Sequence, residues 1–208
     1  MRRQSLSRVL FLNEVYQKIV NVHGVVMEFG TLWGTNLALF QNLRGVYEPF
    51  NHSRKIIGFD TFEGFSSIAP KDGSSKEIKP KNYSTPKGYD NYLEKILAYH
   101  ETQSPIQHIR KFELVKGDAL LTLPTYFKKN PETVIALAFF DMDLYKPTKA
   151  CLEKILPRMP KGAVIVFDEL SLHAFPGETL AVMDVLGIHT CRLQRTPYSS
   201  VSSYMVIE

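Results

Sequence analysis

The feature that most constrains the fold is an alternation of short apolar runs with segments of helical periodicity. The runs predict five strands, within residues 25–29, 55–60, 112–115, 134–140 and 162–167. Residues 134–140 are apolar throughout, as expected of a central strand with helices on both faces. Alternation of this kind predicts βαβ units and an α/β fold, with a mostly parallel sheet in a three-layer sandwich.

The segments around these runs complete the expected organisation. Helices are predicted over 5–20, 34–44, 89–103, 119–129 and 178–186, and another is expected to begin around Pro147. Residues 1–22 thus form a leading helix, and residues 63–90 form a lid-like surface loop rich in lysine, proline and glycine. The tail predicts a C-terminal antiparallel hairpin of 191–195 and 203–207. We expect one domain over residues 1–208.

An acidic residue lies at or just after the end of each predicted parallel strand. These acids are Glu28, Asp60, Asp118, Asp141, Asp168 and Glu169. In open α/β sheets, ligands bind beyond the carboxyl ends of the strands, at the point where the strand order reverses. Carboxylates gathered at one edge repel each other unless cations or hydroxyl groups engage them. The pattern therefore predicts a ligand site at this edge.

The first turn of the sheet reads Glu28-Phe29-Gly30-Thr31-Leu32-Trp33-Gly34. It lacks the G-x-G-x-x-G spacing of a dinucleotide site, but Gly30 and Gly34 let the backbone approach a ligand closely. A nucleoside with a zwitterionic amino-acid tail fits this turn better than a pyrophosphate. Asp60 can accept both ribose hydroxyls or cap its own turn. Asp118 can reach an adenine amino group or cap the helix that follows it.

Composition excludes several other classes of protein. The net charge of +4 is too small and too dispersed for a nucleic-acid binder, and there is no apolar run long enough for a membrane span. Only two cysteines occur, Cys151 and Cys191, which argues for a reducing, cytoplasmic setting without zinc or a disulfide framework. Five lysines between 71 and 87 outnumber the two acids there, so this loop could close over a diphosphate.

Four segments together make a family resemblance specific. They read V-V-M-E-F-G-T-L-W-G, I-I-G-F-D-T-F-E-G-F, A-F-F-D-M-D-L-Y-K-P-T-K-A and K-G-A-V-I-V-F-D-E-L, and F-P-G-E follows at 175–178. Over roughly residues 3–208 the chain resembles the macrocin O-methyltransferase family, closest to its deoxysugar O-methyltransferases. The resemblance implies a class I methyltransferase fold, S-adenosylmethionine as methyl donor, a sugar or nucleotide-sugar acceptor and a homo-oligomer.

The same resemblance implies roles for individual residues. Glu28, Gly30, Thr31 and Gly34 would border the methionine part of the donor. Asp60, Thr61 and Phe62 would hold the ribose and flank the adenine, and Asp118 with Ala119 would reach the adenine edge. Asp141, Asp168 and Glu169 would bind a divalent metal, although the family's usual pair is Asp-Asp and Glu169 departs from it.

Elementary chemistry agrees with a metal-assisted reaction. An all-oxygen site with few protein ligands suits Mg²⁺, which would lower the pKa of a sugar hydroxyl and orient its oxygen. Asp141 is the first candidate for the proton acceptor and His173 the second. Asp143 is expected to turn away from Asp141 or to brace the turn. Salt bridges from the acids to Lys146 and Lys149 are the alternative, purely structural role.

Other roles and functions stay open at this point. Tyr145 and Lys146 could line the acceptor pocket or pack at a helix start, and Trp33 could form a wall of either pocket. The alternatives to a sugar O-methyltransferase are methylation of a catechol-like or other small-molecule hydroxyl, and a non-catalytic cofactor-binding paralogue.

Overall fold

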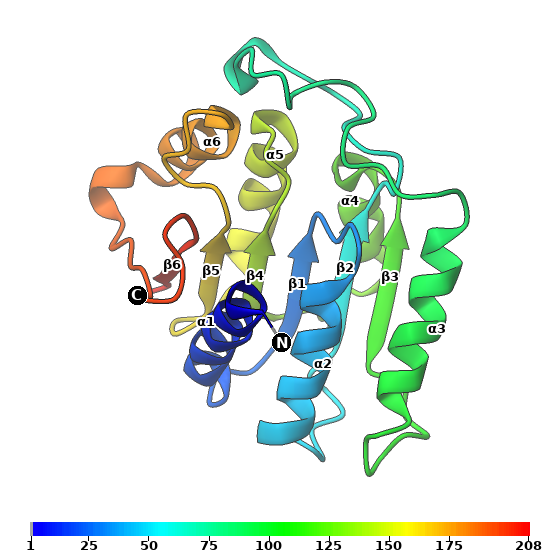
Figure 1. Ribbon diagram of the computed structural model, residues 1–208. Coiled ribbons are helices and arrows are strands. Elements are labelled where there is room, and N and C mark those ends of the chain that lie inside the picture. The colour runs from blue at the N-terminus through cyan, green and yellow to red at the C-terminus, as the bar shows by residue number, and fades with distance from the viewer. Residues whose placement is uncertain (1) are drawn as a thin grey trace.

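The computed structural model describes residues 2–208, which form a six-stranded sheet between two layers of helices (Figure 1). The strands are β1 (Val25–Phe29), β2 (Ile56–Asp60), β3 (Phe112–Lys116), β4 (Ile135–Phe140), β5 (Val164–Phe167) and β6 (Ser203–Val206). Their order across the sheet is β3-β2-β1-β4-β5-β6. The first five run parallel and β6 runs antiparallel to β5. The predicted α/β sandwich is confirmed.

The helices divide evenly between the two faces of the sheet. One layer holds α1 (Arg3–Ile19), α2 (Thr35–Tyr47) and α3 (Tyr89–Glu101), and the other holds α4 (Ala119–Lys129), α5 (Tyr145–Ile155) and α6 (Pro176–Leu186). Each layer has its own apolar core, because strand side chains point alternately to opposite faces. Among the described residues, no helix is both long and apolar enough to cross a membrane.

The strand order reverses between β1 and β4, and this point organises the upper edge of the sheet. The chain leaves β1 for β2 and β3 on one side and later returns to the other side of β1 as β4. The backbone N–H of Asp141 donates to the carbonyl of Phe29 at 2.8 Å, so the ends of the two strands stay joined. Ligands of open α/β sheets bind beyond such a reversal.

The C-terminal tail forms less strand than expected. Residues 203–206 make β6, but the predicted partner 191–195 is reduced to one antiparallel bridge between Gln194 and Tyr204. Ile188–Thr190 is a short 3-10 helix, and the chain then reaches the sheet only at Gln194. β6 is instead paired along its length with β5.

The loop between β2 and α3 crosses the carboxyl end of the sheet and is fixed to it. It contains one 3-10 turn, Pro70–Asp72. Asp72 is fully buried; its Oδ1 accepts from the backbone N–H of Tyr145 at 2.6 Å and its Oδ2 accepts from that of Ala69 at 2.6 Å. The loop lies at the top of Figure 1, above the ends of the parallel strands.

Candidate active site

The turn after β1 carries two buried oxygens without a partner. Glu28 is 1 % exposed; its Oε1 accepts from Asn36 Nδ2 at 2.7 Å, while its Oε2 has no hydrogen-bond partner among the described residues. The Thr31 hydroxyl is likewise buried and unpaired within the described part of the chain. Buried polar atoms are normally satisfied, so these two oxygens are candidates to accept hydrogen bonds from a ligand, but neither residue is among the described residues that line the cavity. Desolvation raises the pKa of Glu28.

Gly30 lets the ends of β1 and β4 approach each other. Its φ is +89°, and a Cβ at this position would lie 1.8 Å from the carbonyl oxygen of Asp141. Gly34 also has a positive φ of +74° and directly precedes α2. The glycine spacing of the turn therefore has a steric cause at both positions.

Asp60 organises the next turn of the site. Its Oδ2 accepts from the backbone N–H of Leu32 at 2.7 Å and its Oδ1 accepts from that of Phe62 at 2.6 Å. Desolvation raises the pKa of Asp60, and these backbone donors oppose the shift. The main cavity of the site lies among the turns that follow the parallel strands. Asp60 and Thr61 line it, and the Thr61 hydroxyl donates to the carbonyl of Gly64 at 2.9 Å.

Phe62 lies where the sequence did not lead us to expect it. It is 5 % exposed and packs in the core beneath α2 and α3, and it is not among the described residues that line the cavity. Its φ of +59° turns its side chain away from the path of the strand. Phe65, three residues later, lines the cavity in its place.

Asp118 combines both of its expected roles. Its Oδ1 accepts from the backbone N–H of Leu120 at 2.9 Å and so caps α4, while its Oδ2 accepts from the Ser66 hydroxyl at 2.9 Å. Asp118 and Ala119 line the cavity beside Gly117. Helix capping and exposure to the cavity are therefore compatible here.

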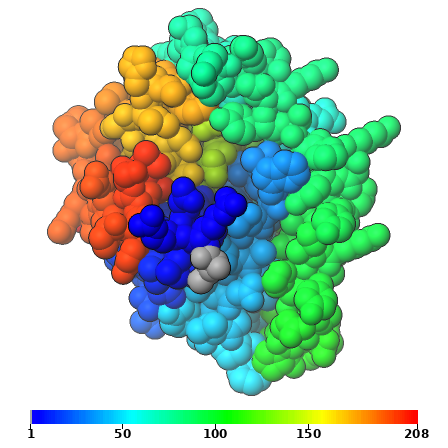
Figure 2. Space-filling view, viewed as in Figure 1, coloured from blue at the N-terminus to red at the C-terminus, as the bar shows by residue number. Residues whose placement is uncertain are grey.

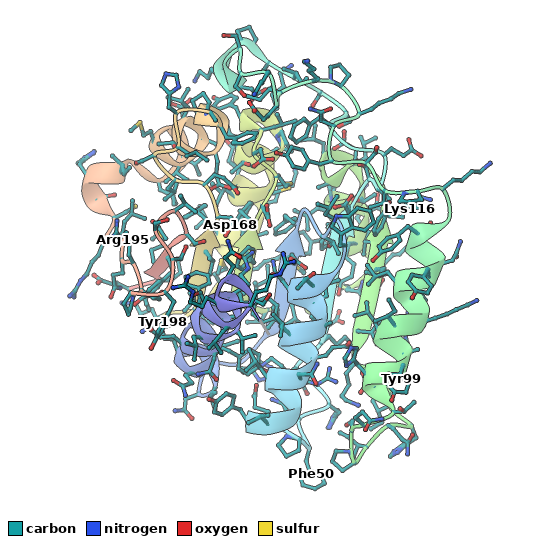
Figure 3. The ribbon with its side chains drawn as sticks, in the orientation of Figure 1. Phe50, Tyr99, Lys116, Asp168, Arg195 and Tyr198 are labelled. Carbon is teal, nitrogen blue, oxygen red and sulfur yellow. The ribbon has the colours of Figure 1, made fainter. Side chains whose placement is uncertain are left out.

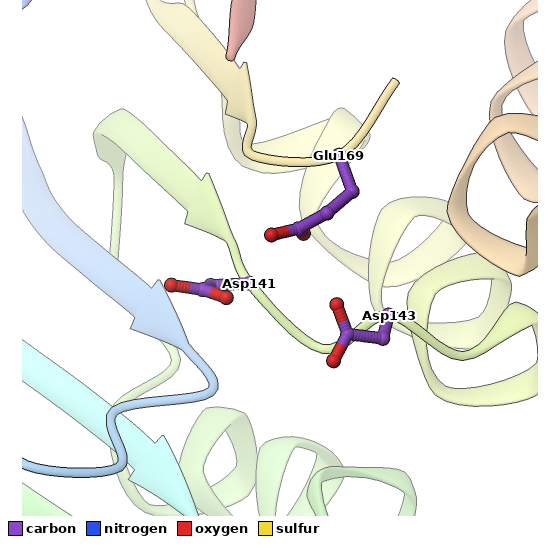
Figure 4. A group of neighbouring side chains, drawn as sticks. All are labelled: Asp141, Asp143 and Glu169. Atoms are coloured by element: carbon purple, nitrogen blue, oxygen red, sulfur yellow. The ribbon is translucent and has the colours of Figure 1, made fainter. Parts of the chain in front are cut away.

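Three carboxylates converge beyond β4 and β5 (Figure 4). One oxygen from each of Asp141, Asp143 and Glu169 lies within 4.8 Å of the other two. All three line the main cavity. Our expectation for Asp143 was wrong: strand alternation ends at Phe140, and a φ of +60° at Asp143 turns the chain so that its carboxylate faces Asp141.

Burial and mutual repulsion control the protonation of this acidic centre. Desolvation and the charges of Asp168 and Asp143 raise the pKa of Asp141. Desolvation raises the pKa of Asp143 to about 6, against an opposing hydrogen bond with Glu169. The pKa of Glu169 is raised by desolvation and by the charge of Asp141. A bound cation would reverse these shifts, so the centre has the electrostatics of a cation site.

Asp168 follows β5 directly, and Figure 3 labels it near the upper end of that strand. Its Oδ1 accepts from Arg8 NH1 at 2.6 Å and from the Ser202 hydroxyl at 2.6 Å. Arg8 NH2 also lies 3.7 Å from Asp141 Oδ2, and Arg8 Nε donates to Asn36 Oδ1 at 3.0 Å. Arg8 therefore links Asn36, the partner of Glu28, to Asp168 and Asp141, a set of contacts that no motif in the sequence indicated.

A fourth buried acid supports the centre from behind. Glu178, in the first turn of α6, is fully buried, and its Oε1 accepts from the backbone N–H of Glu169 at 3.1 Å. Desolvation raises its pKa. The sequence placed Glu178 beside Pro176 and Gly177 in a motif but did not indicate this contact.

Several expected pocket residues lie outside the cavity. His173 is exposed, and so is Lys146. Trp33 is 49 % exposed and packs edge-to-face on Tyr89 with ring centres 4.9 Å apart. Tyr145 donates its hydroxyl to Asp184 at 2.6 Å. None of these side chains belongs to the described residues that line the cavity.

Aromatic side chains form part of the cavity wall. The Phe65 and Tyr83 rings lie 5.3 Å apart, and the Tyr83 and Phe175 rings 6.3 Å apart. The cavity measures about 180 Å³, below the roughly 300–1,000 Å³ typical of small-molecule sites. We therefore expect the loop that carries Phe65 and Tyr83 to move when a ligand of nucleoside size enters.

Fold and site together define a class I methyltransferase. Its sheet order with an antiparallel last strand, its glycine turn at the strand reversal, and its acids at successive strand ends are the features of that class.

Comparison with solved structures identifies the family. CalS11, the calicheamicin methyltransferase, is 41 % identical with a TM-score of 0.96, over 99 % of this chain and 80 % of that one. The apo structure of CalS11, described as a TDP-rhamnose 3'-O-methyltransferase, is 40 % identical with a TM-score of 0.86 over the same shares. The O-methyltransferase NovP is 16 % identical with a TM-score of 0.71, and the match covers 97 % of this chain and 79 % of the NovP chain. This likeness supports the fold alone.

No protein-family model and no curated protein sequence matches the chain. At 41 % identity over nearly its whole length, the chain belongs to the same family as CalS11, the macrocin O-methyltransferase family. It is an S-adenosylmethionine-dependent O-methyltransferase. The resemblance stated from the sequence motifs is thereby confirmed.

Proposed function

We propose that this enzyme methylates a hydroxyl group of a nucleotide-linked sugar, with assistance from a divalent metal. The observation that carries the proposal is the convergence of Asp141, Asp143 and Glu169 one strand away from the glycine turn. The sugar is supported by CalS11, which is described as acting on TDP-rhamnose and shares 40 % of its sequence with this chain.

The residues of the first crevice fit S-adenosylmethionine. The unpaired Glu28 Oε2 and Thr31 Oγ1 suit the ammonium group of its methionine part. Asp60 and Asp118 line the cavity and would hold the ribose and the adenine, with Thr61 and Ala119 beside them. Gly30 and Gly34 keep the turn open, and Phe62 contributes only from the core.

The acidic centre fits a magnesium ion. Hard cations prefer carboxylate oxygens, and the mutual repulsion of buried acids is relieved by such an ion. Asp141 and Glu169 are two proposed ligands, and two acids compete for the third position. Asp143 already faces the centre, whereas Asp168, which the family pattern favours, is engaged by Arg8 and Ser202.

A magnesium ion held there would supply Lewis acidity that lowers the pKa of the acceptor hydroxyl. The chain's own residues then orient and deprotonate that hydroxyl. Asp141 is the proposed proton acceptor, because it is part of the acidic centre and also packs against Gly30 in the turn that is proposed to hold the methyl donor. Its ionised form is needed for this role, and Arg8 favours that form. His173 is exposed and remains the second candidate.

A panel of acceptors with radiolabelled methyl donor tests the proposal. We expect transfer to a TDP-linked 6-deoxyhexose, loss of transfer in excess EDTA, and recovery with Mg²⁺. Asp141→Asn should abolish turnover while binding of S-adenosylhomocysteine persists in calorimetry, and His173→Gln should retain turnover. Transfer to catechols alone would replace the sugar by a phenolic acceptor, and full activity in EDTA would remove the metal.

A further inference from the structure

A second cavity has in its lining Arg8, the residue that also contacts Asp141 of the acidic centre. This arginine groove, of about 850 Å³, runs between the first turns of α1 and the segment 198–201, and Arg2, Arg3, Arg8, Tyr198, Ser199 and Ser200 are among its lining residues. Figure 2 shows the dark-blue start of the chain next to the orange-red segment near its end. Of the residues in its lining, the mechanism described above uses only Arg8.

The charges of the two cavities are opposite. The main cavity is lined by Asp60, Asp118 and the three carboxylates of the acidic centre, and by no lysine or arginine among the described residues. The arginine groove has three arginines in its lining and, within residues 2–208, no acid. Without a bound cation the first cavity repels a diphosphate, whereas the second attracts one through the protein's own charges.

The basic groups of the groove are available to a ligand. Within residues 2–208, neither Arg2 nor Arg3 forms an ion pair, whereas Arg8 is already paired with Asp168. α1 begins at Arg3 without a side-chain cap, so its first backbone N–H groups and its positive dipole end add to the groove. The hydroxyl of Ser200 supplies a further donor, whereas the Ser199 hydroxyl already donates to Ser202 Oγ at 3.0 Å.

The two cavities meet at the pair of Arg8 and Asp141, whose NH2 and Oδ2 atoms are 3.7 Å apart. An acceptor that presents its hydroxyl to Asp141 therefore lies beside Arg8, which lines the same groove as Arg2 and Arg3. We propose that the arginine groove binds the diphosphate of a nucleotide-linked acceptor, with Arg2 and Arg3 as its principal ligands. This inference rests on the proposed function and names the part of the acceptor that the acidic centre cannot hold.

The rival site is the lysine-rich loop. Lys76 and Lys79 are exposed, none of the loop's lysines is among the described residues lining either cavity, and Lys71 is paired with Asp184 at 2.6 Å. Movement of the loop could still bring Lys76, Lys79 and Lys81 to a diphosphate. The two sites make different predictions for substitution.

Binding of thymidine diphosphate, measured by calorimetry at fixed ionic strength, separates them. The double variant Arg2→Ala/Arg3→Ala should weaken the Kd about tenfold or more, because two charge-assisted contacts are lost. Lys128→Ala/Lys129→Ala removes the same net charge at the exposed end of α4 and should change the Kd less than about twofold. The triple variant Lys76→Ala/Lys79→Ala/Lys81→Ala should behave like that control.

Turnover distinguishes failure of the groove from failure of the proposed function. With a TDP-linked 6-deoxyhexose, the Arg2→Ala/Arg3→Ala variant should have a KM raised about tenfold and a kcat near that of the wild type. Binding of thymidine diphosphate through the arginines without methylation of any sugar would refute the function and leave the groove. Equal Kd values for the arginine variant and the Lys128/Lys129 control, or weaker binding only in the loop variant, would overturn the inference.

Discussion

Replacement of Gly30 by alanine tests whether the close approach of β1 and β4 shapes the site. The new Cβ would lie 1.8 Å from the carbonyl oxygen of Asp141, in backbone that cannot move far because the Asp141 N–H is bonded to Phe29. A non-glycine residue at a φ of +89° adds strain of about 1–2 kcal/mol. Relief of the overlap by backbone shifts adds roughly 1–3 kcal/mol.

The sum is a loss of about 2–5 kcal/mol in the free energy of unfolding. For a chain of 208 residues this lowers the melting temperature by roughly 5–15 °C. The same shift moves the Asp141 carbonyl and so disturbs both the Glu28–Gly34 turn and the acidic centre. We therefore expect weaker binding of S-adenosylhomocysteine even at temperatures where Gly30→Ala remains folded.

Gly45 provides the matched control. It lies within α2, is exposed, and a Cβ there would meet nothing within 4 Å. Gly45→Ala should raise the free energy of unfolding by about 0.5–1 kcal/mol through helix propensity alone. Chemical denaturation and thermal melts of both variants measure the difference. The reasoning is refuted if Gly30→Ala stays within about 0.5 kcal/mol of the wild type, or if both variants shift in the same direction.

Three further predictions concern other parts of the structure. Desolvation raises the pKa of Glu48, but hydrogen bonds led by that from buried Arg54 outweigh it and leave the pKa lowered. The stability that ionised Glu48 contributes is therefore fully present above the usual pKa of 4.5 and is lost as the pH falls through the lowered value. The variant Glu48→Gln should lose about 3 kcal/mol in the free energy of unfolding at pH 7. When unfolding is measured against pH, its stability should fall less steeply at acidic pH than that of the wild type. In Mn²⁺ titrations, Glu169→Gln should weaken binding about tenfold and Asp168→Asn far less, and the reverse order would make Asp168 the ligand. In Asp72→Asn, an amide donor faces the backbone N–H of either Ala69 or Tyr145, so one of the two hydrogen bonds is lost. Hydrogen exchange in the 61–88 loop should accelerate, while the melting temperature changes little. Unchanged exchange would show that other contacts hold the loop.

Much of the fold can be predicted from the sequence, because a strand buried on both faces of the sheet is a continuous run of apolar residues. The fully apolar run 134–140 is a central strand in the structure, as β4. The C-terminal tail was harder to predict. The edge strand β6 is already paired with β5 and needs no second partner, so residues 191–195 contribute only the Gln194 bridge. Short apolar segments near an edge do not carry the information that decides pairing.

The site was predictable where a residue acts at a strand end and was missed where the backbone turns. Glu28 and Asp60 lie where the strand pattern put them. Asp143 was misplaced because a positive φ breaks the alternation from which its orientation was inferred, whereas Phe62, whose role came from the family resemblance, is turned into the core at a positive φ of its own. Arg8 could not be found at all, since it lies 160 positions from Asp168 and no local pattern joins them.

Arg8 also explains how the acids can remain together at this edge of the sheet. Buried carboxylates that face one another destabilise the folded chain unless a positive charge is present. Arg8 supplies one such charge to Asp168 and Asp141, and its ring contact with Phe139, 5.0 Å from the guanidinium carbon, fixes it against the sheet. That charge serves the β5 side of the edge, while Asp143 and Glu169 lie on the cavity side with no arginine or lysine among the described lining residues. The distribution of charge thus divides the edge into a part neutralised by the protein and a part suited to an external cation, and the Mn²⁺ titrations of the Asp168 and Glu169 variants measure where that division falls.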